Sequence, residues 1–304
     1  MAFDHEGASL KVLSDGFKFV ENLLSKALSF SLESLETDPE SFVEFLDLTS
    51  QLRLLVLEEI DLTTRHAFCL FANIYHCLLQ QALLLSVNGP LDKKNIGLFM
   101  RTSCYEIGGD VFSLAELYCC VLRGKMCKAV NPKPPYIEAS RKSSKYRHYA
   151  LSYNDPRVNF VLVSFEPSVR SSLIFCYSCF LLSWQNTGDT ACPQTVPILR
   201  PSDLEDQLNV VAAAFLKKEL VIDTRRRLVL LPKVCEIYKH DFGSDSLACL
   251  KFCMQQLDEG AVSTIRAIIG ESHLVIRYQH ISESYHSLLK YRDDLAGAHL
   301  NQVL

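Results

Sequence analysis

The sequence predicts a helix-rich α+β fold, built as a single domain with a small, mainly antiparallel sheet. Long stretches of the N-terminal half repeat apolar residues at helical spacing. Farther along the chain, short apolar runs flank turn residues and predict a few strands. The composition agrees, because 48% of the 304 residues are hydrophobic and 22% are charged, as in globular proteins.

Three helices are predicted in the first 90 residues. The apolar spacing predicts amphipathic helices over 8–32 and 41–60, each with charged residues on its opposite face. A third helix, over 65–86, is apolar on most of its faces, so we expect it to be central and buried. The sequence Asn88-Gly89-Pro90 ends it, because Gly and Pro do not continue a helix.

A strand, a turn and a capped helix are predicted next. Residues 105–107 form a short strand, and Gly108-Gly109 begins a turn. The Gly-Gly pair lacks the glycine spacing of a phosphate-binding loop, which favours the turn. Ser113 and Glu116 form a capping box, which predicts a helix that runs to residue 123.

The remaining signals alternate between helices and strands. A basic, proline-containing stretch, 128–148, is predicted to be a surface loop, and 158–163 a buried strand. Ser202 and Glu205 form a second capping box at a helix start. The other predicted elements are a hairpin of 220–222 with 228–231, helices over 233–240, 247–257 and 262–269, and a strand over 273–278.

Charge and hydropathy argue against several classes of partner. The net charge of −4 gives no reason to expect a general affinity for nucleic acid. No run of 18 uninterrupted apolar residues is present, so we expect no membrane-spanning helix. The first residues lack the apolar core of a secretory signal peptide. We therefore expect a cytoplasmic protein.

The cysteines predict neither a disulfide framework nor a cofactor. In a reducing compartment, most of the twelve cysteines are expected to be small buried hydrophobic residues. The pair Cys176 and Cys179 has Cys-x-x-Cys spacing but lacks the second pair that a zinc site needs. Cys249 and Cys253 lie on one face of a predicted helix. We expect no metal and no cofactor.

Five blocks of the chain resemble, in order, those of a known family. RHAFCLFANIYHCLL (65–79) resembles its AFWINLYNAL helix, and YEIGGDVFSLAELYCCVLRG (105–124) resembles YxIGGxxYSLDDIExxILRG. DPRVNFVL (155–162) resembles DPRIHFAL. NTGDTACPQTVPILRPSDLEDQL (186–208) and LLPKVCEIYKHDFG (230–243) resemble NCGAxSCPPIRxYxxENLxxxL and LPKIFxWYxxDFG. The chain thus resembles DUF547, a domain of unknown function.

The resemblance implies a chain of three parts. Residues 1–60 are expected to form an N-terminal helical segment that packs on the domain. Residues 61–280 are expected to be the DUF547-like domain. Residues 281–304 do not match the YDWSLN-like segment that commonly closes the family, so we interpret them as a divergent tail.

An apolar insertion, 163–185, interrupts the family pattern. Removing these 23 residues joins DPRVNFVL directly to NTGDTACP, as in the family. The first two residues can be encoded by GTGAGT, a splice donor, and Gln185 by CAG, a splice acceptor. The residues between 173 and 183 all have pyrimidine-rich codons available. We interpret the segment as a translated intron; the alternative is a genuine insertion that packs on the core.

The resemblance also implies a thiol chemistry that this chain has partly lost. The family's polar set includes one His and two Cys, and a cysteine nucleophile needs a neighbouring imidazole. Asn159 occupies the His position and Thr187 the first Cys position, which leaves Cys192. Asn159 cannot act as a general base. His76 could substitute, although a His on an apolar helix is more often a core residue.

Other positions that match or lie within the family's motifs are candidate binding residues. For Arg123, Arg157 and Asp241, a buried ion pair or a loop-fixing role is the alternative. The candidate binding residues are Asn73, Tyr75, Arg123, Arg157, Asn159 and Asp241.

Two classes of function remain open. The first is a non-catalytic protein-interaction or scaffolding domain with a protein partner, which the loss of the family His and Cys favours. The second is a thiol-dependent hydrolase or transferase with Cys192 as nucleophile, impaired by Asn159. A membrane contact through the apolar residues 175–184 is a third possibility, which the short length of the segment disfavours.

Overall fold

A computed structural model describes most of the chain outside the insertion. The described residues are 15–86, 96–130, 148–162, 195–270, 274–279 and 290–291. They confirm the helix-rich α+β class, since helices predominate and the strands form three small sheets. The insertion 163–185, Cys192, all of 131–147 and most of 281–304 lie outside the described residues.

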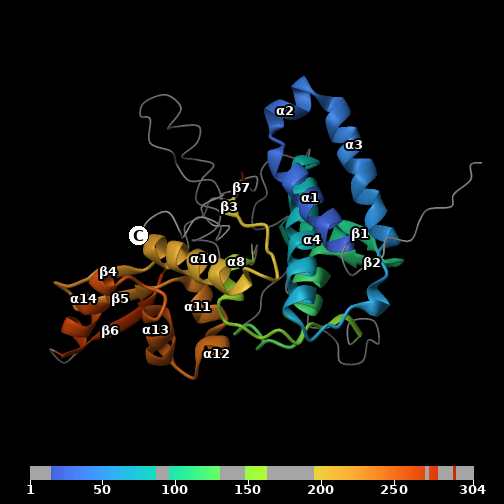
Figure 1. Ribbon diagram of the computed structural model, residues 1–304. Coiled ribbons are helices and arrows are strands. Elements are labelled where there is room, and N and C mark those ends of the chain that lie inside the picture. The colour runs from blue at the N-terminus through green and yellow to red at the C-terminus, as the bar shows by residue number, and fades with distance from the viewer. Residues whose placement is uncertain are drawn as a thin grey trace, which may run out of the picture.

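The predicted central helix is α4 (Arg65–Leu84), which occupies the middle of the larger of two hydrophobic clusters. Helix α1 (Asp15–Ser29) packs along it, and α2 (Leu32–Thr37) and α3 (Pro39–Ser50) follow at the same end of the molecule (Figure 1). By length and composition α4 could cross a membrane, but 94% of its most apolar 18-residue window is buried inside the protein. The apolar character of α4 is therefore that of a core helix.

A β-hairpin covers another part of this first cluster. Strands β1 (Cys104–Ile107) and β2 (Asp110–Ser113) pair antiparallel, and α5 (Ile96–Thr102) packs against β2. Gly108 and Gly109 close the hairpin at φ values of 59° and 81°, where a side chain would be strained. The predicted strand and turn are confirmed, and β2 lies where the sequence indicated only the approach to a helix.

The capping box after β2 is confirmed, but the helix it opens is unusual. The Ser113 side chain accepts from the Glu116 amide, while the Glu116 side chain accepts from the Ser113 amide. Helix α6 (Leu114–Glu116) then widens into the π-helix η3 (Leu117–Leu122). Such wide turns often occur at functional sites, and this one ends at Arg123.

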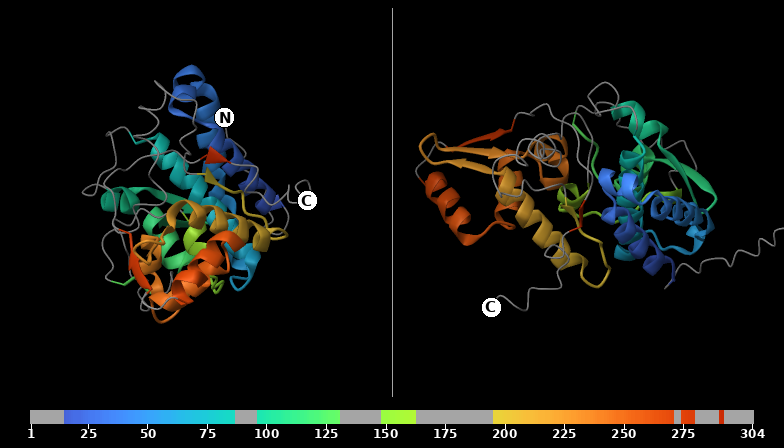
Figure 2. Two further views of the ribbon diagram at one scale, coloured as in Figure 1. Left: turned by 90° about the vertical axis from the view of Figure 1, so that its left-hand side faces the viewer. Right: turned by 90° about the horizontal axis from the view of Figure 1, so that it is seen from above.

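The second hydrophobic cluster is formed by α10, a three-stranded sheet and the helices α11 to α14. Strand β5 is the central strand, paired antiparallel with β4 and parallel with β6. Figure 2 shows these elements, coloured yellow to red, beside the blue-to-green elements of the first cluster. The elements are α10 (Leu204–Glu219), β4 (Val221–Asp223), β5 (Leu228–Leu231), α11 (Lys233–Ile237), α12 (Lys239–Phe242), α13 (Ser246–Met254), α14 (Glu259–Gly270) and β6 (Val275–Tyr278).

A short parallel pair joins two distant parts of the chain. Strand β3 (Thr195–Val196) pairs with β7 (Lys290–Tyr291), and β7 also contacts α1. The C-terminal region thus returns to the N-terminal helix, a contact that the sequence did not predict.

Three predicted elements differ in the structure. The strand expected over 158–163 is wrong, because the described part forms the short helix α8 (Val158–Val161). Asp155 starts this turn, since its side chain accepts from the Arg157 amide and its carbonyl from the Val158 amide. A short apolar run fits a buried helix as well as a buried strand.

The other two differences concern helix ends. The helix expected over 41–60 ends at Ser50, and two single 3₁₀ turns, η1 (Gln51–Leu54) and η2 (Leu57–Glu59), follow it. There the Leu52 carbonyl accepts from the Gly108 amide of the hairpin. The capping box expected at Ser202 and Glu205 is absent in this described region, because α10 begins one residue later, after Asp203.

Candidate functional site

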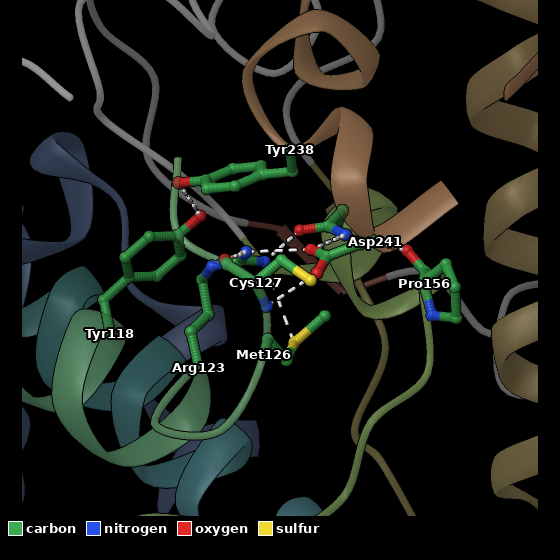
Figure 3. Close-up of polar contacts among 8 residues, drawn as sticks. Tyr118, Arg123, Met126, Cys127, Pro156, Tyr238 and Asp241 are labelled. Atoms are coloured by element: carbon green, nitrogen blue, oxygen red, sulfur yellow. Dashed lines mark hydrogen bonds and ion pairs between the residues drawn. The ribbon is translucent and has the colours of Figure 1, made fainter. Parts of the chain in front are cut away.

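The candidate site lies where the two hydrophobic clusters meet, and Arg123 is its centre. Arg123 follows η3, whose wide turn carries the Arg123 amide to the Tyr118 carbonyl at 3.1 Å. Its guanidinium points toward α12 of the second cluster (Figure 3). Only 5% of Arg123 is exposed, so its charge requires partners within the protein.

The adjoining Gly124 allows this close approach. A Cβ at Gly124 would lie 2.5 Å from the Cys120 carbonyl oxygen and 2.6 Å from the Ala150 Cβ. The Leu151 amide donates to the Val121 carbonyl in the same place, at 3.0 Å. The segment after η3 therefore packs backbone to backbone against residues 150–151, and Gly is required there.

Four groups surround the Arg123 guanidinium. It donates to the Asp241 carboxylate at 2.8 Å, to the Cys127 carbonyl at 3.0 Å and to the Asn159 side-chain oxygen. Its central carbon lies 3.6 Å from the centroid of the Tyr238 ring, a cation–π contact. Burial disfavours the charged form, but Tyr238, Tyr118 and Asp241 together raise the pKa of Arg123 above its usual value.

The Asp241 carboxylate is likewise surrounded by hydrogen-bond donors. Besides Arg123, it accepts from the Asn159 amide nitrogen at 3.0 Å and from the Cys127 backbone amide at 2.9 Å. Its side chain has no exposed surface. Because the ion pair is buried and hydrogen-bonded at both ends, neither charge is left uncompensated.

The contacts around Arg123 and Asp241 form a buried polar junction between the two clusters. Two tyrosines extend this junction toward the central helix α4. The hydroxyls of Tyr118 and Tyr238 share a hydrogen bond of 3.1 Å between η3 and the α11–α12 connection. The ring of Tyr75 on α4 lies 5.8 Å from that of Tyr118, centroid to centroid. Tyr75 is fully buried, and burial raises its pKa well above the usual value.

Arg157 and Asn73 lie outside this junction and join other segments. Arg157 donates to Glu205 and Asn209 of α10, each at 2.6 Å, and to Asp155 beside it. Asn73 of α4 donates to the Leu199 carbonyl at 2.8 Å and accepts from the Leu199 amide at 2.9 Å. Both residues therefore fix α10 or the segment before it.

His76 and Cys192, the predicted catalytic pair, are not shown to meet. His76 is fully buried on α4, and burial lowers its pKa to about 3. An imidazole in that environment stays neutral and is a weak proton acceptor. Cys192 lies outside the described residues. The structure brings together Arg123, Asn159 and Asp241, and Tyr75 reaches them through Tyr118.

Sequence reasoning missed Cys127 and Met126, which complete the junction. Cys127 contributes its backbone carbonyl and amide, and the Met126 sulfur lies 3.7 Å from an Arg123 nitrogen. The exposed Cys127 thiol is a poor nucleophile, because desolvation and the Asp241 charge raise its pKa. The contacts of Cys127 are made by its backbone, which carries no sequence signal, so no pattern could have revealed them.

Comparison with known families bears out the resemblance found in the sequence. Residues 60–178 match the family model described as "Protein of unknown function, DUF547". This segment is a DUF547 domain. Neither a curated protein nor a solved structure matches the chain.

The DUF547 match includes one half of the buried polar junction. Arg123 and Asn159 lie within the matched residues, whereas Asp241 and Tyr238 follow them by 60 residues or more. The matched DUF547 segment therefore completes its buried ion pair with Asp241 on α12, which lies outside the match.

Proposed function

We propose that the chain is a non-catalytic protein-interaction or scaffolding domain of the cytoplasm. One observation supports this most directly: four of the polar residues at family motif positions, together with Asn159 at the family His position, hold chain segments to one another. Those five residues are Asn73, Arg123, Arg157, Asn159 and Asp241. A catalytic set would aim such groups at a reacting atom.

The exposed Cys127 thiol and the His76 imidazole also favour a non-catalytic domain. His76 is buried with a pKa of about 3, and the pKa of the exposed Cys127 thiol is raised. The side chain of Asn159, at the position of the family His, is hydrogen-bonded to Arg123 and Asp241.

The outer face of the three-stranded sheet offers exposed apolar side chains to a protein partner. Ile222, Val229 and Ile276 face the second cluster, so their neighbours along each strand face outward. Val221 and Val275 on that outer face are 45% and 39% exposed. Exposed apolar side chains on a sheet with two edge strands suit contact with an apolar protein surface.

Cross-linking of the tagged full chain in cells, with the linked peptides mapped by mass spectrometry, tests this proposal. We expect partner peptides to link near β4 and β6. The linkage should fall at least about tenfold in Val221→Glu/Val275→Glu, since a charge is costly in an apolar contact. Val43→Glu on α3, where the valine is 57% exposed, is the matched control and should leave the linkage unchanged.

The enzyme alternative predicts a different result. A nucleophilic Cys192 would be alkylated with a pH midpoint well below about 8.5, the value of an ordinary thiol. That result, together with a partner linkage that is unchanged in Val221→Glu/Val275→Glu, would contradict the proposal of a non-catalytic interaction domain.

We also propose that the segment 163–185 is a translated intron. The DUF547 match ends at residue 178, within this segment, although family-like motifs resume at residue 186. Sequencing transcripts across the junction of Leu162 and Asn186 should show a form without these codons. If every transcript carries them, the segment is a genuine insertion.

A further inference from the structure

Three cysteines that are far apart in the sequence converge in the second hydrophobic cluster. Cys249 and Cys253 are four residues apart on α13, so their side chains share one face of the helix. Cys235 comes from α11. The three sulfur atoms lie within 4.8 Å of one another.

The spacing is close to that of a metal–thiolate site. Zinc–sulfur bonds of about 2.3 Å in a tetrahedral site place their sulfur atoms about 3.8 Å apart. Side-chain rotations on α11 and α13 that bring the sulfurs closer by up to about 1 Å would meet this geometry. All three cysteines have no exposed surface, so a bound ion would be shielded from competing water ligands.

This grouping is unlike that of the other buried cysteines. Within the described residues, the only three-ligand group of metal-binding side chains is this one. Four further buried cysteines are distributed through the first cluster, and those are Cys69, Cys77, Cys119 and Cys120. Buried thiols that belong to no such three-ligand group need only a packing role.

Three buried thiolates side by side would repel one another and would lack solvation. A metal ion at the centre of the three sulfurs would supply the positive charge that they need.

We propose that Cys235, Cys249 and Cys253 form a three-thiolate site for a thiophilic metal ion of the Zn²⁺ or Cu⁺ class. Soft thiolate ligands select these ions. As each sulfur–metal bond forms, the thiol releases its proton to solvent, so three bonds release up to three protons. The bound ion would link α11 to α13. In the sequence these helices precede and follow α12, which carries Asp241.

Metal binding by the reduced, metal-free full chain tests the proposal. Zn²⁺ and, under anaerobic conditions, Cu⁺ are added separately, and the ion retained after desalting is measured by elemental analysis. We expect one ion of at least one kind per chain, a rise in melting temperature, and an affinity that falls at least about 100-fold in Cys249→Ala and in Cys235→Ala.

Two control variants separate this cluster from other thiols. Cys69→Ala removes a buried cysteine of the first cluster, and Cys176→Ser/Cys179→Ser removes the Cys-x-x-Cys pair. Both should keep the ion, and circular dichroism establishes that every variant is folded.

Several outcomes would overturn the proposal. Binding of neither ion by the wild-type chain is one, and unchanged stoichiometry in folded Cys235→Ala/Cys249→Ala is another. Should the alanine variants fail to fold, the wild-type melting temperature still decides, because an ion held in this core must raise it.

Discussion

The Arg123 guanidinium lies 2.8 Å from the Asp241 carboxylate, although 118 positions separate the two residues. This ion pair joins the end of a π-helix in the first hydrophobic cluster to α12 in the second. Asn159 contacts both partners and adds the short helix α8 to the same junction. The two clusters are therefore held together by a buried polar centre as well as by apolar contact.

Arg123→Met should lower the free energy of unfolding by about 3–5 kcal/mol, because it leaves the buried Asp241 carboxylate without its cation. Urea denaturation followed by circular dichroism measures the loss. Lys26→Met is the matched control, since Lys26 pairs with Glu44, whose side chain is 71% exposed, and should cost about 1 kcal/mol or less.

The double variant Arg123→Met/Asp241→Leu sharpens this test. Removing both charges should restore part of the stability that Arg123→Met alone loses, because no uncompensated charge then remains. A double variant with losses that simply add would show that the two side chains do not interact.

Asn73→Ala should lower the free energy of unfolding by about 1–3 kcal/mol, because the backbone amide and carbonyl of Leu199 lose their partner in a buried site. Thermal unfolding monitored by circular dichroism measures it. Asn22→Ala, at an exposed position of α1, is the control and should change stability by less than about 0.5 kcal/mol. Equal losses of stability in the two variants would contradict a stabilising role for the two hydrogen bonds between Asn73 and Leu199.

Local signals predicted much of the fold correctly. The apolar periodicity of α4 and the Ser113–Glu116 capping box are set by residues within a few turns of each other, and both are confirmed. The strand predicted in the region of α8 is wrong, because a short, mostly apolar run does not distinguish a strand from a buried helix. Likewise, no local sequence pattern predicted that the helix after Glu116 would widen into the π-helix η3.

The candidate site was predicted as single residues rather than as an arrangement. Arg123, Asn159 and Asp241 were each named from family motifs, but their contact depends on how three separate segments fold together. Cys235 joins Cys249 and Cys253 for the same reason, since one lies on α11 and the others on α13. The sequence spacing places Cys249 and Cys253 on one face of a helix, but it gives no sign that Cys235 lies beside them.

Gly124→Ala should lower stability by about 1–3 kcal/mol, because the added Cβ overpacks a tight backbone contact. The nearest atoms would be the Cys120 carbonyl oxygen at 2.5 Å and the Ala150 Cβ at 2.6 Å. Gly270→Ala is the control, because nothing lies within 4 Å of a Cβ there, and it should be close to neutral. The midpoint of urea denaturation compares the two. A neutral Gly124→Ala would mean that residues 150–151 can move away from η3.

The buried imidazole of His76 should make stability depend on pH. Its pKa in the folded chain is about 3, against 6.5 for an ordinary histidine. Between these values the unfolded chain binds a proton that the folded chain does not, so stability is complete above about pH 6.5 and falls with decreasing pH. The expected slope is about 1.4 kcal/mol per pH unit within this window.

His76→Asn should remove this slope, because Asn fills part of the same space and does not titrate. Urea denaturation at intervals from pH 7.5 down to 4.5 compares the variant with the wild type, so that contributions from carboxylates cancel. His66→Asn, at an exposed position of the same helix, is the matched control and should leave the slope unchanged. If His76→Asn and the wild type lose stability in parallel as the pH falls, His76 already binds its proton in the folded chain. The core around α4 would then have to accommodate a charge, contrary to the burial of His76.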